Sequence, residues 1–101
     1  MKMKKSQMEF ARIRTYYELM ITIMLLEDYK VKIAMYRVYD NEVIDIIKRH
    51  RVHSKKTRAS DFTDLTERDI KDDKFVKGRM IRQIECLKAL KELDKKRKSF
   101  F

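Results

Sequence analysis

The second half of the chain contains a predicted helix with one apolar face and with basic side chains largely off that face. From Met80 onward, apolar residues recur every three or four positions, and this puts them on one side of a helix: Met80, Ile81, Ile84, Leu87, Leu90 and Leu93. We expect the basic residues off that side to lie in solvent: Lys77, Arg79, Arg82, Lys88 and Lys91. Such a helix can enter a DNA major groove. An ordinary core helix, kept in solution by its Lys and Arg, explains the same pattern.

Two further segments are rich in cations that could bind phosphate. Six basic residues fall within eleven positions and have no acid among them: Lys48, Arg49, Arg51, Lys55, Lys56 and Arg58. The segment 94–101 contains four consecutive basic residues followed closely by two phenylalanines, and the basic residues are Lys95, Lys96, Arg97 and Lys98. Contacts with phosphate would explain both segments. The alternative for the first segment is a solvated loop, and the alternative for the second is a disordered basic terminus.

Composition favours a small helical domain with a polyanionic partner. The 101 residues include 44% hydrophobic and 42% charged residues, one Gly and no Pro. A β-rich fold would need more turn residues, so we predict one mainly α domain spanning residues 1–101. The formal charge is +10, of which residues 51–101 supply +7, from 16 basic and 9 acidic residues. An excess of this size is typical of proteins that bind nucleic acid or an anionic surface.

The sequence contains no pattern typical of an enzyme, metal or membrane protein. Cys86 is the single cysteine, so no intrachain disulfide can form, and we expect a cytoplasmic protein. His50 and His53 could be combined with Asp45 or Cys86, but zinc sites usually have two pairs of closely spaced ligands. Phosphate-loop and dinucleotide fingerprints are missing. We therefore expect no catalysis, no metal, no cofactor and no small-molecule substrate.

Several helical segments are predicted to position the basic residues. Ser6 and Glu9 form a capping box that starts a long helix over residues 6–28, apolar enough to be central to the fold or shared with a partner subunit. Residues 30–39 fit a helix slightly better than a strand. Asp40 is a candidate N-cap for a helix over residues 41–51.

The next segments read as a short helix, a turn and a longer helix. Thr66 and Asp69 have the spacing of an N-cap and its third helical residue, and Leu65 and Ile70 that of a hydrophobic staple. The short helix should stop near residues 72–73. We expect Gly78 in the turn that follows, or against a phosphate, and a long helix from there to Leu93.

Taken together, residues 41–101 resemble the winged helix-turn-helix superfamily of DNA-binding domains. The resemblance implies a helix-turn-helix core over 41–93 and a wing in 94–101. Its recognition helix would read bases with Lys77, Arg79, Arg82 and Gln83, while Lys74 and Gly78 would join the cations above on phosphates. Asp94-Lys95 stands where the family has a Gly-apolar step, and the sequence stops before a second wing strand could return. We therefore expect a truncated wing, or a hairpin built elsewhere, for instance from residues 30–39.

These observations lead to three possible functions. The first is sequence-specific binding of double-stranded DNA, as a small regulator or accessory factor at a promoter or at a replication or transfer origin of a mobile element. We expect such a protein to be a homodimer joined by the helix over 6–28. The alternatives are an RNA-binding protein and a helical interaction or assembly protein.

Overall fold

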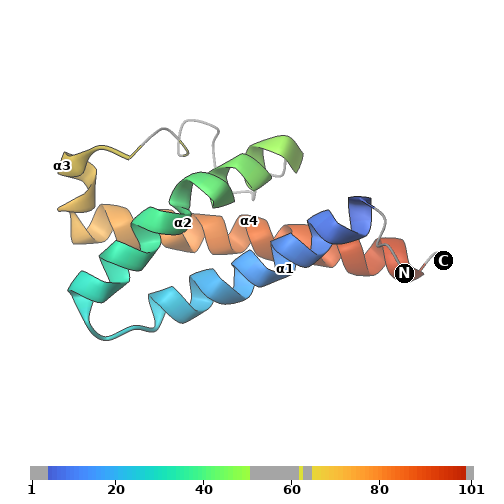
Figure 1. Ribbon diagram of the computed structural model, residues 1–101, viewed down its shortest axis with the longest axis horizontal. Coiled ribbons are helices and arrows are strands. Elements are labelled where there is room, and N and C mark those ends of the chain that lie inside the picture. The colour runs from blue at the N-terminus through green and yellow to red at the C-terminus, as the bar shows by residue number, and fades with distance from the viewer. Residues whose placement is uncertain (1–4, 51–61, 63–64, 100–101) are drawn as a thin grey trace.

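The computed structural model describes residues 5–50, 62 and 65–99, and the regular elements in these ranges are helices (Figure 1). They are α1 (Lys5–Met24), α2 (Tyr29–His50), α3 (Glu67–Ile70) and α4 (Asp73–Ser99). The prediction of a mainly α fold is confirmed. A wing strand within residues 94–99 is wrong, because α4 continues through them to Ser99.

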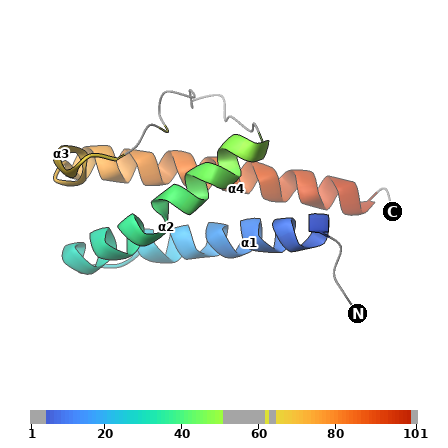
Figure 2. The ribbon, with the colours of Figure 1, turned by 45° about the horizontal axis from the view of Figure 1, so that its top comes forward.

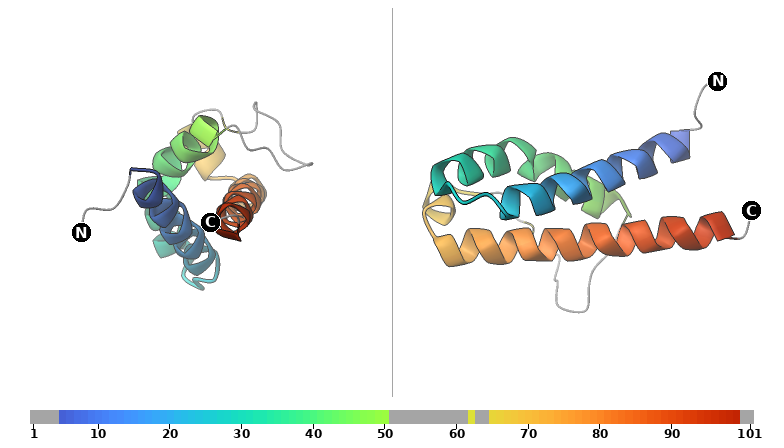
Figure 3. Two further views of the ribbon diagram at one scale, coloured as in Figure 1. Left: turned by 90° about the vertical axis from the view of Figure 1, so that its right-hand side faces the viewer. Right: turned by 90° about the horizontal axis from the view of Figure 1, so that it is seen from below.

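Helices α1 and α4 run antiparallel, and α2 crosses them. α1 packs mainly on α4, with the start of α1 and the end of α4 at the same end of the molecule (Figure 2). Seen along the long axis, α1, α2 and α4 form the three corners of a bundle (Figure 3). α3 is a single turn that lies against the start of α4.

The core lies between the three long helices and uses the apolar positions of each. α1 contributes Phe10, Ile13, Met20 and Ile23. α2 contributes Tyr36, Val43, Ile44, Ile46 and Ile47, and the connection that follows it contributes Phe62. α4 contributes Val76, Met80, Cys86, Leu87 and Leu90. Since α1 buries these residues within the chain, its wide apolar face has an intramolecular explanation, and a dimer joined by α1 remains a prediction.

The buried stripe of α4 differs from the predicted one. Buried residues follow the line Val76, Met80, Gln83, Leu87, Leu90 and Asp94. Two residues expected in the apolar stripe, Ile81 and Leu93, are instead 44% and 46% exposed. The buried face of α4 is therefore centred closer to Gln83 and Asp94 than predicted. A hydropathy pattern places both of these polar residues outside a core.

α1 is shorter than predicted and α2 is longer. α1 ends at Met24, and Asp28 caps α2, because its Oδ1 accepts hydrogen bonds from the amides of Lys30 at 3.0 Å and Val31 at 3.3 Å. The helical assignment of residues 30–39 is confirmed. Asp40 as an N-cap is wrong, because it lies inside the continuous helix Tyr29–His50.

The start of α3 follows the sequence closely. Thr66 Oγ1 accepts from the Asp69 amide at 3.2 Å, and Asp69 Oδ2 accepts from the Thr66 amide at 3.2 Å, which confirms the N-cap. The Thr66 hydroxyl donates to Asp69 Oδ2 at 2.8 Å, and this bond, with the one from the Thr66 amide, lowers the pKa of Asp69 below its usual value. Asp72 then caps α4 by accepting from the amides of Lys74 and Phe75.

Gly78 lies within α4, so its expected place in a turn is wrong. α4 already begins at Asp73, one turn earlier than the sequence suggested. A Cβ atom at Gly78 would come within 3.3 Å of the Arg82 Nη1 atom. The missing side chain therefore leaves room for the Arg82 guanidinium along the helix surface.

Candidate nucleic-acid interface

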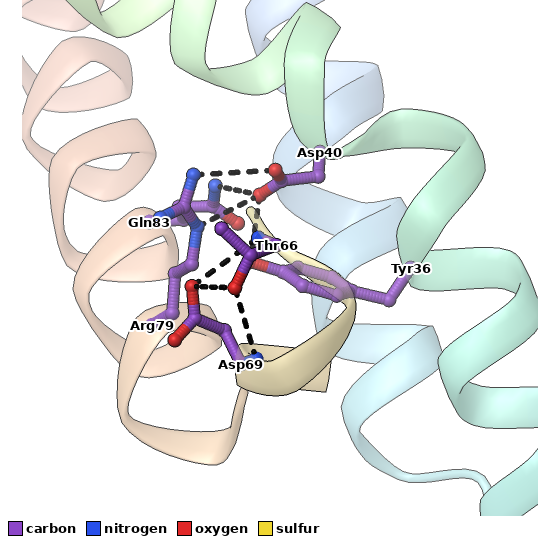
Figure 4. Close-up of polar contacts among 6 residues, drawn as sticks. All are labelled: Tyr36, Asp40, Thr66, Asp69, Arg79 and Gln83. Atoms are coloured by element: carbon purple, nitrogen blue, oxygen red, sulfur yellow. Dashed lines mark hydrogen bonds and ion pairs between the residues drawn. The ribbon is translucent and has the colours of Figure 1, made fainter. Parts of the chain in front are cut away.

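A buried polar cluster joins α2 to α4 and decides which face of α4 is exposed (Figure 4). Asp40 Oδ1 accepts from Tyr36 Oη at 2.7 Å and from Gln83 Nε2 at 2.7 Å. Arg79 donates from Nε to Oδ1 at 3.1 Å and from Nη2 to Oδ2 at 3.2 Å. Arg79 and Gln83 are 0% exposed and Asp40 is 2% exposed. One carboxylate therefore holds two side chains of α4 and one of its own helix.

The cluster is strong because its members are shielded from water. A two-pronged contact between a guanidinium and a carboxylate is geometrically specific and is stronger than a neutral hydrogen bond. Burial and the charge of Asp40 raise the pKa of Tyr36, so its hydroxyl remains a donor. The Oε1 atom of Gln83 is buried and meets no donor among the described residues, a cost that the other contacts must offset.

The expectation that Arg79 lies in solvent is wrong, and Gln83 is buried beside it. Both were predicted to read bases, but in this arrangement their donors point to Asp40 between the helices. To reach a base edge, either side chain would have to leave a buried ion-paired cluster. The sequence does indicate that Gln83 is buried, because Gln83 has the helical spacing of Val76, Met80 and Leu87.

The other two predicted base readers lie at the surface to different degrees. Lys77 is exposed, whereas Arg82 is half-buried with its Nη1 near the backbone of Gly78. Lys74, Lys95 and Lys96, predicted to contact phosphate, are exposed on the same helix. Lys88, which was noticed as basic but not chosen as a contact, is exposed as well.

Three of these lysines form a straight row, which we call the lysine row: Lys77, Lys88 and Lys95. Eleven residues separate the first two and seven separate the last two, which are close to whole numbers of helical turns. At about 1.5 Å per residue, the row extends over about 27 Å of α4. Among the described residues, the row is the most regularly spaced set of basic side chains.

The charge of α4 reinforces the lysine row. Residues 73–99 contain ten Lys or Arg and four Asp or Glu, a net +6 out of the formal +10 of the chain. Glu92 lies 3.8 Å from the Nζ atom of Lys95, but both side chains are more than half exposed, and such surface pairs bind weakly. Beside the row, Lys91 Nζ lies 4.3 Å from the ring centre of Tyr17 on α1.

The basic end of α2 is less available than its sequence suggests. Arg49 Nη2 lies 3.1 Å from Glu9 Oε1 and 3.2 Å from Asp45 Oδ2, so two acids offset its charge. Lys48 is exposed. The predicted contacts Arg51, Lys55, Lys56 and Arg58 lie outside the described residues. Arg97 and Lys98 belong to α4, but their side chains lie outside the described part.

The surface formed by the described residues includes two open depressions. One, of about 580 Å³, lies at the α3–α4 turn and is lined by charged residues that include Arg68 and Lys74. The other, of about 440 Å³, lies between α2 and α3 and is lined by Arg37, Asp40, Asn41, Leu65 and Ile70. Over the described ranges, His, Cys, Asp and Glu side chains form no group that could hold a metal ion. No described helix is long and apolar enough to cross a membrane.

Comparisons of the chain with models of protein families, with curated proteins and with solved structures find no match. A function is therefore proposed from the geometry of the site alone.

Proposed function

We propose that the protein binds double-stranded DNA through the exposed face of α4, with the lysine row against phosphates. The observation that carries the proposal is the alignment of Lys77, Lys88 and Lys95 on one exposed line of a helix with net charge +6. Lysine ammonium groups that neutralise phosphates release counterions, and this release supplies most of the affinity in non-specific DNA binding.

We propose further that α3 and α4 act as a compact helix-turn-helix unit. The capping box of Thr66 fixes the start of α3, and Asp72 fixes the start of α4 after a two-residue connection. The Asp40 cluster then fixes the rotation of α4 about its axis, because Arg79 and Gln83 must face α2. These contacts support a role for α4 as a rigid helix with its lysine row turned outward.

The test is the salt dependence of binding to a duplex of about 20 base pairs, with K77Q/K88Q as the variant. Each phosphate contact contributes about −0.9 to the slope of log K against log salt concentration. Loss of two contacts is therefore expected to make the slope less negative by about 1.8.

The matched control is K30Q/R37Q, which removes the same charge from exposed positions on α2. We expect this control to leave the slope close to that of the unchanged protein. Equal slopes for the two variants would mean that net charge alone attracts DNA, and the assignment to α4 would be wrong. Circular dichroism of both variants checks that the helices are intact.

A further inference from the structure

We infer that α4 binds the DNA backbone and not the edges of bases, so that binding is independent of base sequence. This inference rests on the proposed function and replaces the sequence-specific reading that the resemblance implied. It follows from which side chains α4 exposes, how they are spaced, and where its guanidinium and amide groups are held.

The first argument is the chemistry of the exposed face. Within residues 73–96, the exposed polar side chains of α4 are Asp73, Lys74, Lys77, Lys88, Glu92, Lys95 and Lys96. Forked groups such as guanidinium and carboxamide read bases with two hydrogen bonds at once. An ammonium group acts more as a point charge, which suits a phosphate but discriminates poorly between bases.

The second argument is that the Asp40 cluster holds two forked groups of α4, those of Arg79 and Gln83, inside the fold. Arg79 directs two nitrogens to Asp40, at 3.1 and 3.2 Å, and Gln83 directs its amide nitrogen to the same carboxylate. Both side chains are fully buried. Two residues whose groups could read guanine and adenine are therefore used to hold the fold together.

The third argument is spacing. Recognition helices read three or four neighbouring bases with a few side chains that lie close together at one end of the helix. The members of the lysine row are separated by about 16 and 10 Å along the axis, which corresponds to several base pairs. Such intervals match contacts with separate phosphates better than contacts with consecutive bases.

Arg82 is the remaining forked group on α4 whose side chain the structure describes at the surface. It is half-buried, and its Nη1 lies over Gly78, along the helix. We expect Arg82 to add positive charge without choosing a base. The variant R82K keeps that charge but removes the fork, so it separates the two roles.

The test is selection from a random duplex pool at about 150 mM salt, a near-physiological ionic strength, with direct titration of two unrelated duplexes. We expect no enriched motif and dissociation constants that agree within about threefold, whereas specific proteins prefer their sites by about a thousandfold or more. R82K is expected to bind both duplexes as the unchanged protein does.

Three results would count against these statements, and they are distinguishable. An enriched motif bound at least tenfold more tightly than the unrelated duplexes would overturn the inference and leave the proposed function intact. A motif preference that R82K abolishes would do the same and would assign base reading to Arg82. Failure to bind any duplex at about 50 mM salt, where phosphate contacts are strongest, would overturn the proposed function and the inference with it.

Discussion

The Asp40 cluster and a cluster around Glu9 both join helices through ion pairs, and their exposure to water differs. The Asp40 cluster connects α2 to α4 with side chains that are 0% and 3% exposed in its ion pair. The Glu9 cluster connects α1 to the end of α2, where Arg49 is 45% exposed and Glu9 is 20% exposed. The pairing chemistry is the same, but water and salt screen the second cluster. We therefore expect the Asp40 cluster to determine how the helices pack and the Glu9 cluster to add little to their packing.

The Asp40 cluster offers the largest expected effect. We expect D40A to lower the free energy of unfolding by about 3–5 kcal/mol, because the Arg79 charge would stay buried without the Asp40 carboxylate. Urea denaturation measures the change. The double variant D40L/R79M should recover part of the loss, since it removes the buried charge, whereas Tyr36 and Gln83 still lose their acceptor. If the double variant is as unstable as D40A, the loss comes from packing or from the acceptor that Tyr36 and Gln83 lose, and not from the buried charge of Arg79.

A smaller effect is expected at Tyr36, which gives one hydrogen bond to the Asp40 carboxylate at 2.7 Å. Y36F should lower the free energy of unfolding by about 1.5–3 kcal/mol, the usual range for a hydrogen bond to a charged group. The pKa of Tyr36 is raised in the folded state, so its contribution is present below the unfolded pKa of about 10 and is lost as the pH rises through the folded pKa. Unfolding from pH 8 to 11 should therefore be flatter for Y36F, and identical profiles would contradict this role.

The smallest effect is expected at Glu9. We expect E9Q to change the free energy of unfolding by less than about 1 kcal/mol, since its partners are partly exposed. Arg49 also keeps its contact with Asp45 at 3.2 Å. Unfolding at about 50 mM and 500 mM salt should show that the small effect shrinks as salt increases. A loss above about 2 kcal/mol at both salt concentrations would remove the contrast between the two clusters.

Local signals in the sequence predicted much of the fold. The capping box of Thr66 and Asp69 depends on residues three apart, so it could be recognised without tertiary information. The helical nature of residues 30–39 depends on the same short-range preferences. The missed N-cap at Asp40 shows the limit, since an aspartate suits a cap equally well in isolation, and only the position of Arg79 and Gln83 reveals its role.

The candidate interface was predictable in part. The exposure of Lys74, Lys77, Lys95 and Lys96 agrees with their place outside the apolar pattern. Arg79 and Gln83 were misplaced because a hydropathy pattern counts every arginine and glutamine as a surface residue. Burying them requires an acid from another helix, and a partner that is 39 or 43 residues away leaves no trace in local spacing.

The glycine inside α4 has a consequence for how stable this protein can be made. A glycine in a helix interior costs about 0.5–1 kcal/mol relative to alanine, because the unfolded chain gains freedom there. The one contact that a methyl group at Gly78 would tighten involves the far end of the flexible Arg82 side chain, at 3.3 Å. The native sequence thus forgoes helix propensity at a position where the fold itself does not demand it, and this position is where a thermostabilised form of the protein could be started.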